Sequence, residues 1–319
     1  MFDVKTAVLK AENRIRSHIR ETPLDFSVPL SKLTNVNLYL KCENLQHTGS
    51  FKVRGALNAL LSLKKNRQNG IVAASTGNHG AAVAYGLHNL KLPGVIFVPE
   101  NVSPVKKENI SFYNVPLKLY GRDCVETELQ AIDYAKHHDM VYVSPYNNTQ
   151  VIAGQGTIGI ELLHQLDSVD VIFIPVGGGG LISGVAGYIK AVSPKTKIIG
   201  CLPENSPVMS ESIKAGKIIS MDSLPTLSDA TAGGIEHDSI TFDLCREYVD
   251  DFVLLSENEI RSALLTILKI QHLLIEGAAA VALAAFLKCV PYYQGKNAVV
   301  ILSGANISLE TLRNVIQQL

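Results

Sequence analysis

Short β-branched apolar segments alternate with segments of helical apolar spacing along almost the whole chain. This pattern predicts strands at 36–43, 70–75, 93–99, 116–121, 140–145, 169–176, 197–203 and 297–303. It predicts helices at 81–90, 125–138, 157–166 and 257–274, and a further helix that opens at Phe51–Lys52. Because parallel strands need crossover connections, which are usually helical, the alternation indicates an α/β fold of twisted, mainly parallel sheets with helices on both faces.

The composition narrows the class of protein. A chain of 319 residues with 47% hydrophobic and 18% charged residues suits two packed α/β lobes. The net charge is zero, which argues against nucleic-acid or anionic membrane partners. The longest apolar runs, such as 278–287, are shorter than the ~20 residues of a membrane span. The five scattered cysteines lack the spacing of a zinc or redox motif and no signal peptide is evident, so we expect a soluble, cytoplasmic protein.

Glycine-containing segments occur at three points where an expected strand ends: STGNHG (75–80), GGGG (177–180) and SGAN (303–306). In open α/β sheets, ligands bind at the carboxyl ends of the strands. Three such segments in one chain predict that a single ligand is held from several sides.

Lys52 stands in the first turn of an expected helix, directly after the turn Thr48–Ser50. The positive end of the helix dipole disfavours a cation at this position. A lysine that simply faces solvent is one interpretation. The other is an amine whose pKa is lowered by the dipole and by burial, which would make it a nucleophile toward an aldehyde.

The other glycine-containing segments suggest anion sites. Four consecutive glycines that lead into an apolar helix expose main-chain N–H groups, which suits a phosphate better than a bare flexible turn. No Gly-Lys-Ser/Thr follows, so this is not a Walker loop. Residues 75–80 could offer donors to a carboxylate, although an ordinary Asn-Gly turn would look partly similar. Ser303 could meet a heteroatom, and alone it is weak evidence.

Together these segments resemble, over almost the whole chain, the threonine dehydratase and serine racemase group of fold-type II pyridoxal 5'-phosphate (PLP) enzymes. ENLQHTGSFKVRGA (43–56), STGNHG, GGGGL (177–181) and SGAN carry the resemblance, in this order. Segments 153–163 and 224–235 look closest to the branch that contains the hydroxyectoine-utilisation dehydratases. The resemblance implies a two-domain fold like that of the tryptophan synthase β subunit, and a homodimer. The large PLP-binding domain would be 1–68 with 147–319, the small domain 69–146, and the active site would lie in the cleft between them.

The resemblance also assigns roles to residues. Lys52 would hold PLP as a Schiff base and move the Cα proton, while Phe51 would lie against the ring and Asn78 would meet the ring hydroxyl. The phosphate would be held by Gly177, Gly178, Gly179, Gly180 and Leu181. The substrate would be bound by Ser75, Thr76, Gly77, Asn78 and His79. Ser303 would hydrogen-bond the pyridine nitrogen, and a neutral hydroxyl there leaves that nitrogen largely unprotonated, which suits β-elimination. Glu276 matches a family glutamate near the cofactor, whose role stays open.

The implied activity is a dehydratase (ammonia-lyase) that converts L-threonine or L-serine to a 2-oxo acid and ammonia. The alternatives are an amino-acid racemase and a dehydratase of a related acid, such as β-hydroxyaspartate or a hydroxyectoine catabolite. A catalytically silent PLP-binding protein is a third class, against which Lys52 and the complete substrate loop argue. Serine racemases have a serine where this chain has Thr76, whose hydroxyl keeps racemisation open as a side activity.

Two further departures concern metals and regulation. The family's cation site uses a glutamate where this chain has Leu202. An apolar side chain cannot ligate a hard cation, so we expect no metal there, although Glu204 is close in sequence. The chain ends at Leu319, soon after SGAN, so we expect no C-terminal regulatory domain of the kind found in biosynthetic threonine dehydratases.

Overall fold

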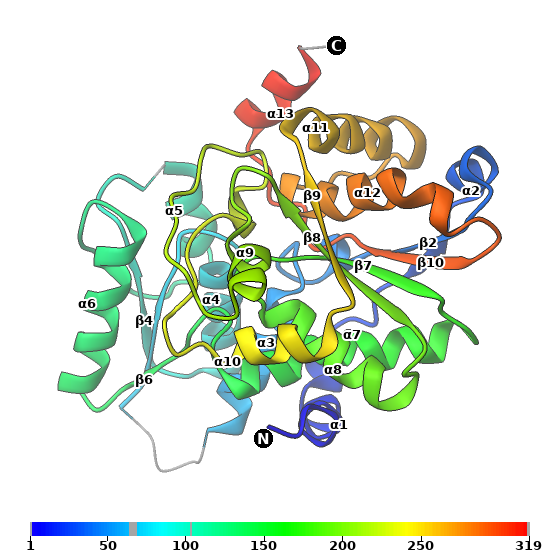
Figure 1. The fold of residues 1–319 in the computed structure, drawn as a ribbon. Helices are drawn as coiled ribbons and strands as arrows, with labels where there is room; N and C mark the ends of the chain where they lie inside the picture. The colour runs from blue at the N-terminus through cyan, green and yellow to red at the C-terminus, as the bar shows by residue number, and fades with distance from the viewer. Residues whose placement is uncertain (1, 64–68, 103, 318–319) are drawn as a thin grey trace.

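The chain forms two β-sheets with helices packed against them, as seen in a computed structural model that describes residues 2–63, 69–102 and 104–317 (Figure 1). In the larger sheet the strand order is β1-β2-β10-β7-β8-β9. Its strands are β1 (Leu24–Phe26), β2 (Asn37–Lys41), β7 (Val171–Pro175), β8 (Lys197–Pro203), β9 (Asp251–Leu255) and β10 (Asn297–Ile301). Strand β1 pairs antiparallel with β2, and the other pairs of this sheet are parallel.

The smaller sheet is parallel throughout and has the order β5-β4-β3-β6. Its strands are β3 (Ile71–Ala74), β4 (Gly94–Val98), β5 (Leu117–Leu119) and β6 (Val141–Tyr142). Side chains of β3 alternate between two cores, as a pleated strand requires. Ile71 and Ala73 pack with α3 (Lys52–Ser62) and α4 (Asn78–Leu90), whereas Val72 packs with α6 (Cys124–His137) on the other face.

Helices also cover both faces of the larger sheet (Figure 1). One face carries α7 (Thr149–Gln165) and α8 (Gly180–Val192), which pack on Ile172 and Ile174. The opposite face carries α11 (Glu257–Thr266) and α12 (Gly277–Cys289), and Phe286 of α12 meets Phe173 of β7 edge to face. The remaining helices are α1 (Val4–Ile15), α2 (Val28–Thr34), α5 (Pro104–Ser111), α9 (Val208–Ala215), α10 (Ile240–Tyr248) and α13 (Leu309–Ile316). The predicted α/β class with mainly parallel sheets is therefore confirmed.

All eight predicted strands are present, with ends that differ by a few residues. Strands β1 and β9 were not predicted, because β1 is a three-residue edge strand and β9 is only partly buried. Helix α7 begins at Thr149 and not at 157, because the Asn148 side chain caps it by accepting from the N–H groups of Gln150 and Val151. The helix expected at 257–274 gives way at Ile267–Gln271 to a π-helical turn.

Helix α7 packs unusually closely against its neighbours through glycines. A Cβ added at Gly154 would lie 2.6 Å from the carbonyl oxygen of Arg54 on α3. A Cβ at Gly184 of α8 would lie 2.2 Å from the carbonyl oxygen of Ile152. These contacts explain the glycine-rich sequence 153–159, and they hold the helix that carries Lys52 against the helix that follows the four glycines.

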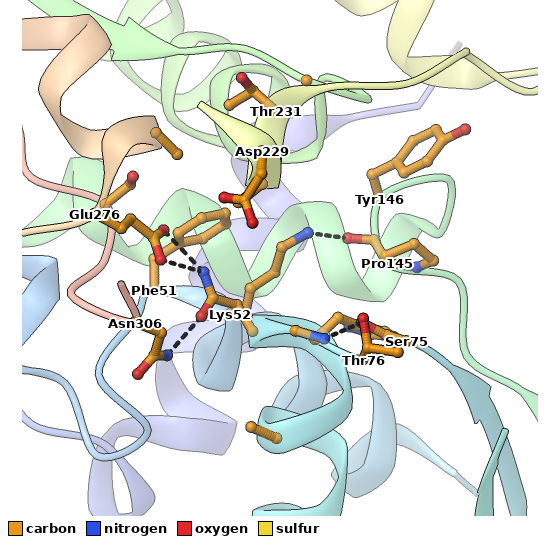
Figure 2. A pocket seen from close by; sticks show the side chains of 18 of the residues that line it. Phe51, Lys52, Ser75, Thr76, Pro145, Tyr146, Asp229, Thr231, Glu276 and Asn306 are labelled. Atoms are coloured by element: carbon orange, nitrogen blue, oxygen red, sulfur yellow. Dashed lines mark hydrogen bonds between the residues drawn. The ribbon is translucent and has the colours of Figure 1, made fainter. Parts of the chain in front are cut away.

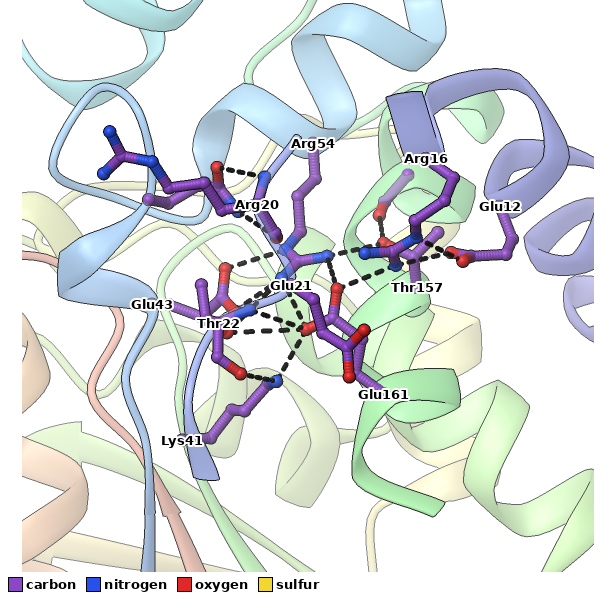
Figure 3. A network of polar contacts seen from close by, with 12 residues as sticks. Glu12, Arg16, Arg20, Glu21, Thr22, Lys41, Glu43, Arg54, Thr157 and Glu161 are labelled. Atoms are coloured by element: carbon purple, nitrogen blue, oxygen red, sulfur yellow. Dashed lines mark hydrogen bonds and ion pairs between the residues drawn. The ribbon is translucent and has the colours of Figure 1, made fainter. Parts of the chain in front are cut away.

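A buried network of charges lies under the start of α3 (Figure 3). Arg54 binds Glu43 through Nε and Nη2, both at 2.8 Å, and Glu161 through Nη1 and Nη2, at 2.7 and 2.9 Å. Lys41 Nζ lies 2.6 Å from Glu161 Oε2. These four side chains are at most 2% exposed. Paired and hydrogen-bonded charges are tolerated in a core, so the network fixes α3 relative to β2 and α7.

Candidate active site

One cavity of about 510 Å³ opens where β3, β7 and β10 end. Every residue that the sequence assigned to the site lines it: Phe51, Lys52, Ser75, Thr76, Gly77, Asn78, His79, Gly177, Gly178, Gly179, Gly180, Leu181 and Ser303. Figure 2 shows Lys52 at its centre, with Glu276 and Asn306 on one side and Pro145 and Tyr146 on the other. The three glycine-containing segments therefore meet at one place, as their positions after strands predicted.

Lys52 is the first residue of α3, and its amine is held inside the cavity. Its Nζ donates to the carbonyl oxygen of Pro145 at 2.8 Å and lies 5.3 Å from the centre of the Phe51 ring. Burial lowers the pKa of Lys52 to about 8, and the carboxylate of Glu276 opposes this shift. The amine therefore reaches its neutral, nucleophilic form at a lower pH than an ordinary lysine.

The four glycines turn from β7 into the N-terminus of α8. Gly179 has φ of +85°, which favours glycine, and it precedes the first helical residue. A Cβ at Gly178 would lie 2.4 Å from the ring of Tyr146, and one at Gly177 would lie 2.9 Å from the main chain of Thr231. Only a chain without side chains fits here, and the first N–H groups of α8 have no helical acceptor. The result is a cradle of donors suited to an anion.

A second helix N-terminus faces the same cavity. Ser75 to Gly77 lead into α4, and the N–H of Gly77 donates to Ser75 Oγ at 3.2 Å. Gly80 is required in the turn, because a Cβ there would lie 2.2 Å from the carbonyl oxygen of Ser75. Two helix N-termini directed at one cavity can hold two separate anionic groups, such as a phosphate and a carboxylate.

His79 is buried and neutral. Its Nε2 lies 2.9 Å from the carbonyl oxygen of Val143. A carbonyl only accepts, so Nε2 carries the hydrogen and Nδ1 is an acceptor. Burial lowers the pKa of His79 to about 3, and Lys52 lowers it further. The imidazole is therefore no cation for a carboxylate, and a substrate contact at His79 would come from its main-chain N–H.

Glu276 closes the side of the cavity next to Asn78. Asn78 Nδ2 donates to Glu276 Oε1 at 2.8 Å and Oε2 at 3.1 Å, and Asn78 Oδ1 accepts from Asn306 Nδ2 at 2.5 Å. Burial raises the pKa of Glu276 to about 7, while the Asn78 hydrogen bond acts in the opposite direction. The sequence placed Glu276 near the site but gave it no role.

Several lining residues had not been predicted from the sequence. Pro145 contributes a main-chain carbonyl, and the hydroxyl of Tyr146 accepts from the N–H of Glu236 at 2.9 Å. Asp229 and Thr231 lie in a short 3₁₀ helix on the opposite wall. These contacts join segments distant in sequence, and a main-chain acceptor has no sequence signature.

The donors and acceptors of the cavity fit PLP. The Lys52 amine can bond the aldehyde carbon, and the glycine cradle can hold the phosphate. Ser303, 2% exposed, brings a neutral hydroxyl between them, and its carbonyl accepts from the N–H of Phe51. Each part of the cofactor thus finds a group of suitable chemistry.

Known proteins are similar over nearly the whole chain. L-threonine ammonia-lyase of Thermotoga maritima is 38% identical over 98% of this chain and 77% of its own length. The catabolic L-threonine dehydratase TdcB of Escherichia coli is 35% identical over 98% of this chain and 97% of its own. Maize serine racemase superposes with a TM-score of 0.92 at 30% identity, covering 98% of this chain and 97% of that one.

A threonine deaminase isoform from Solanum lycopersicum superposes with a TM-score of 0.93 at 32% identity, covering 98% of this chain and 92% of that one. The sequence matches the family described as "Pyridoxal-phosphate dependent enzyme" over residues 15–304, a stretch that contains every predicted site residue. The chain belongs to this family of pyridoxal-phosphate-dependent enzymes.

Proposed function

We propose that this chain is a PLP-dependent ammonia-lyase that converts L-threonine, L-serine or both to a 2-oxo acid and ammonia. The observation that carries the proposal is the buried Lys52 amine in one cavity with two helix N-termini. Bound PLP supplies the electron sink that allows the Cα–H bond to break. The chain supplies the positions of the reacting groups and the proton carrier.

We assign the cofactor contacts as follows. Lys52 Nζ would hold the cofactor and, once released, take the proton from Cα. The main-chain N–H groups of Gly177–Leu181 would bind the phosphate, and Phe51 would lie against the ring. Asn78 would meet the ring hydroxyl, and the Ser303 hydroxyl would donate to the pyridine nitrogen. Loss of the Cα proton and of the β-hydroxyl removes one water, and hydrolysis of the unsaturated product then returns one water and releases ammonia.

The substrate carboxylate would bind at the N-terminus of α4. There Ser75, Thr76, Gly77, Asn78 and His79 would offer main-chain N–H groups and hydroxyls, as other helix N-termini do for anions. The carboxylate would then hold Cα within reach of Lys52. The Thr76 hydroxyl, which also lines the cavity, could return a proton to Cα.

Amino-acid racemisation is the second candidate, and Thr76 is the observation that favours it. A hydroxyl placed to protonate Cα from the face opposite Lys52 would invert the configuration there. The two activities can share one protein, because both begin with loss of the Cα proton. Chiral chromatography of recovered serine measures the racemase share directly.

A substrate panel tests the proposed function. L-Threonine, L-serine, D-serine and β-hydroxyaspartate are incubated separately with the PLP-loaded protein, and the 2-oxo acid and ammonia formed are measured. We expect turnover of L-threonine or L-serine, with both products in equal amounts. Turnover of β-hydroxyaspartate alone would identify a different dehydratase, and inversion without 2-oxo acid would identify a racemase. No product from any of the four would contradict the proposal.

Metal removal should leave the activity unchanged. Leu202 is a buried core residue of β8, 1% exposed, and cannot ligate a cation, while Glu204 is exposed just beyond the strand. In the described part of the chain no three His, Cys, Asp or Glu side chains cluster as metal ligands would. We expect the same rate before and after EDTA treatment. A loss of activity that magnesium or calcium restores would show that other groups hold a required cation.

The organisation of the chain is part of the proposal. We infer that residues 69–146, which include the smaller sheet, form a small domain, and that 1–68 and 147–319 form the large one. The expected boundary at 68 lies outside the described residues. None of the described helices has the length and hydrophobicity of a membrane span. The homodimer, the cytoplasmic location and the hydroxyectoine-utilisation branch stay predictions, and light scattering would measure the oligomeric state.

A further inference from the structure

Three polar side chains and a main-chain carbonyl form a directed chain of hydrogen bonds along the cavity wall. Asn306 Nδ2 donates to the carbonyl oxygen of Thr48 at 3.0 Å and to Asn78 Oδ1 at 2.5 Å. Asn78 Nδ2 then donates to both carboxylate oxygens of Glu276. Figure 2 shows Asn306 and Glu276 on the same side of Lys52.

The two ends of this chain determine the direction of every bond in it. A main-chain carbonyl can only accept, so the Asn306 atom that faces Thr48 must be its NH2 group. That group also faces Asn78, which must therefore turn its oxygen toward Asn306. The NH2 group of Asn78 is left for Glu276, which accepts but cannot donate when it is ionised.

We infer that Glu276 is a positioning residue that fixes the Asn78 amide, so that Asn78 presents an N–H donor and no oxygen to the cavity. The inference rests on the proposed function, because it takes PLP as the occupant of the cavity. One hydrogen of the Asn78 NH2 group can serve both carboxylate oxygens. The second stays available for a partner in the cavity that Asn78 lines. That partner is the ring oxygen of PLP, and an N–H donor favours its anionic form.

The surroundings of Glu276 are built for a carboxylate. A Cβ at Gly304 would lie 2.5 Å from Glu276 Oε1, so only glycine leaves room for it. The N–H of Glu276 donates to the Gly304 carbonyl at 2.9 Å, which ties it to the SGAN turn. The main-chain N–H of Asn306 also stabilises the ionised carboxylate. Donors therefore converge on Glu276 from two sides, and an amide in its place would turn its own NH2 group toward one of them.

A double-mutant cycle on PLP affinity tests the inference without any substrate. PLP is removed from the full-length protein, and PLP is then titrated into wild type, Glu276→Gln, Asn78→Ala and the double variant. If Glu276 acts through Asn78, Glu276→Gln weakens PLP binding by about tenfold or more in the wild-type background. In the Asn78→Ala background the same change alters the affinity by less than about twofold. Equal effects in both backgrounds, or no effect in either, would overturn the inference.

An exchange of the two groups separates positioning from folding. In Glu276→Gln/Asn78→Asp the new amide donates to the new carboxylate, which still accepts from Asn306. All hydrogen bonds of the chain are kept and the net charge is unchanged, but the cavity now meets an acceptor. We expect unfolding of the cofactor-free protein near the wild-type temperature together with PLP binding weakened by about tenfold or more. Wild-type affinity in this variant would refute the inference.

Two controls complete the design. Glu310→Gln removes a carboxylate from the exposed first turn of α13 and should leave the PLP affinity unchanged. If Glu276→Gln alone does not fold, the exchanged variant carries the test. Because the readout is PLP binding, a protein that obeys the cycle but yields no 2-oxo acid would contradict the proposed function and support the inference about Glu276.

Discussion

Lys52→Ala is expected to lower the rate of 2-oxo acid formation by about 10⁴-fold or more, which is ~5.5 kcal/mol of barrier. The substitution removes both the amine that holds the cofactor and the base that takes the Cα proton. One residue with two roles in the same reaction cannot be replaced by its neighbours. The measurement is the initial rate with saturating L-threonine or L-serine and added PLP.

The fold should survive this change. In the structure the Lys52 amine makes one hydrogen bond, to Pro145, and its burial disfavours the charged form, so its loss removes little stability. Lys107→Ala, on the exposed surface of α5, is the matched control and should keep the wild-type rate. Borohydride reduction and peptide mapping should label Lys52 in wild type. Label on another lysine, or a Lys52→Ala rate within about tenfold of wild type (~1.4 kcal/mol), would contradict the assignment.

The parts of the site that follow strand ends could be predicted from the sequence. Lys52, the loop 75–80 and the four glycines each combine a local pattern with a definite place after a buried strand. The topology of a parallel sheet then brings these places together. The same reasoning predicted the eight central strands, because both-face burial leaves a clear apolar pattern. It missed β9, whose side chains are mostly half-buried.

The role of Glu276 depends on a contact that no local pattern encodes. Its partner Asn78 is 198 positions away in sequence, and the direction of their hydrogen bond depends on the carbonyl of Thr48 in a third segment. The Pro145 carbonyl that accepts from Lys52 illustrates the same limit, since any residue offers a carbonyl. Contacts of this kind follow from the assembled fold, and the sequence predicts only the segments that the fold brings together.

The buried charges beneath α3 give the second large effect. Arg54→Met should destabilise the fold by about 3–5 kcal/mol, because Glu43 and Glu161 would lose their shared partner in a site without water. Lys41 would still face Glu161, but Glu43 would keep only the Thr22 hydroxyl, at 2.5 Å, among the contacts described above. Chemical denaturation of the cofactor-free protein measures the change. Arg246→Met is the control, since its pair with Asp243 is exposed and should contribute well under ~1 kcal/mol.

The same network should give the wild-type protein a distinct acid response that Arg54→Met lacks. Burial alone would raise the pKa of Glu161, but Arg54 and then Lys41 outweigh it and lower the pKa to about 2. A carboxyl whose pKa is lower in the folded protein stabilises the fold above its ordinary pKa of 4.5, and this contribution is lost as the pH falls toward 2. Without Arg54 the pKa of Glu161 rises, so the stability difference between the two proteins should shrink as the pH falls below 4.5. A difference independent of pH would show that Arg54 stabilises α3 by packing alone.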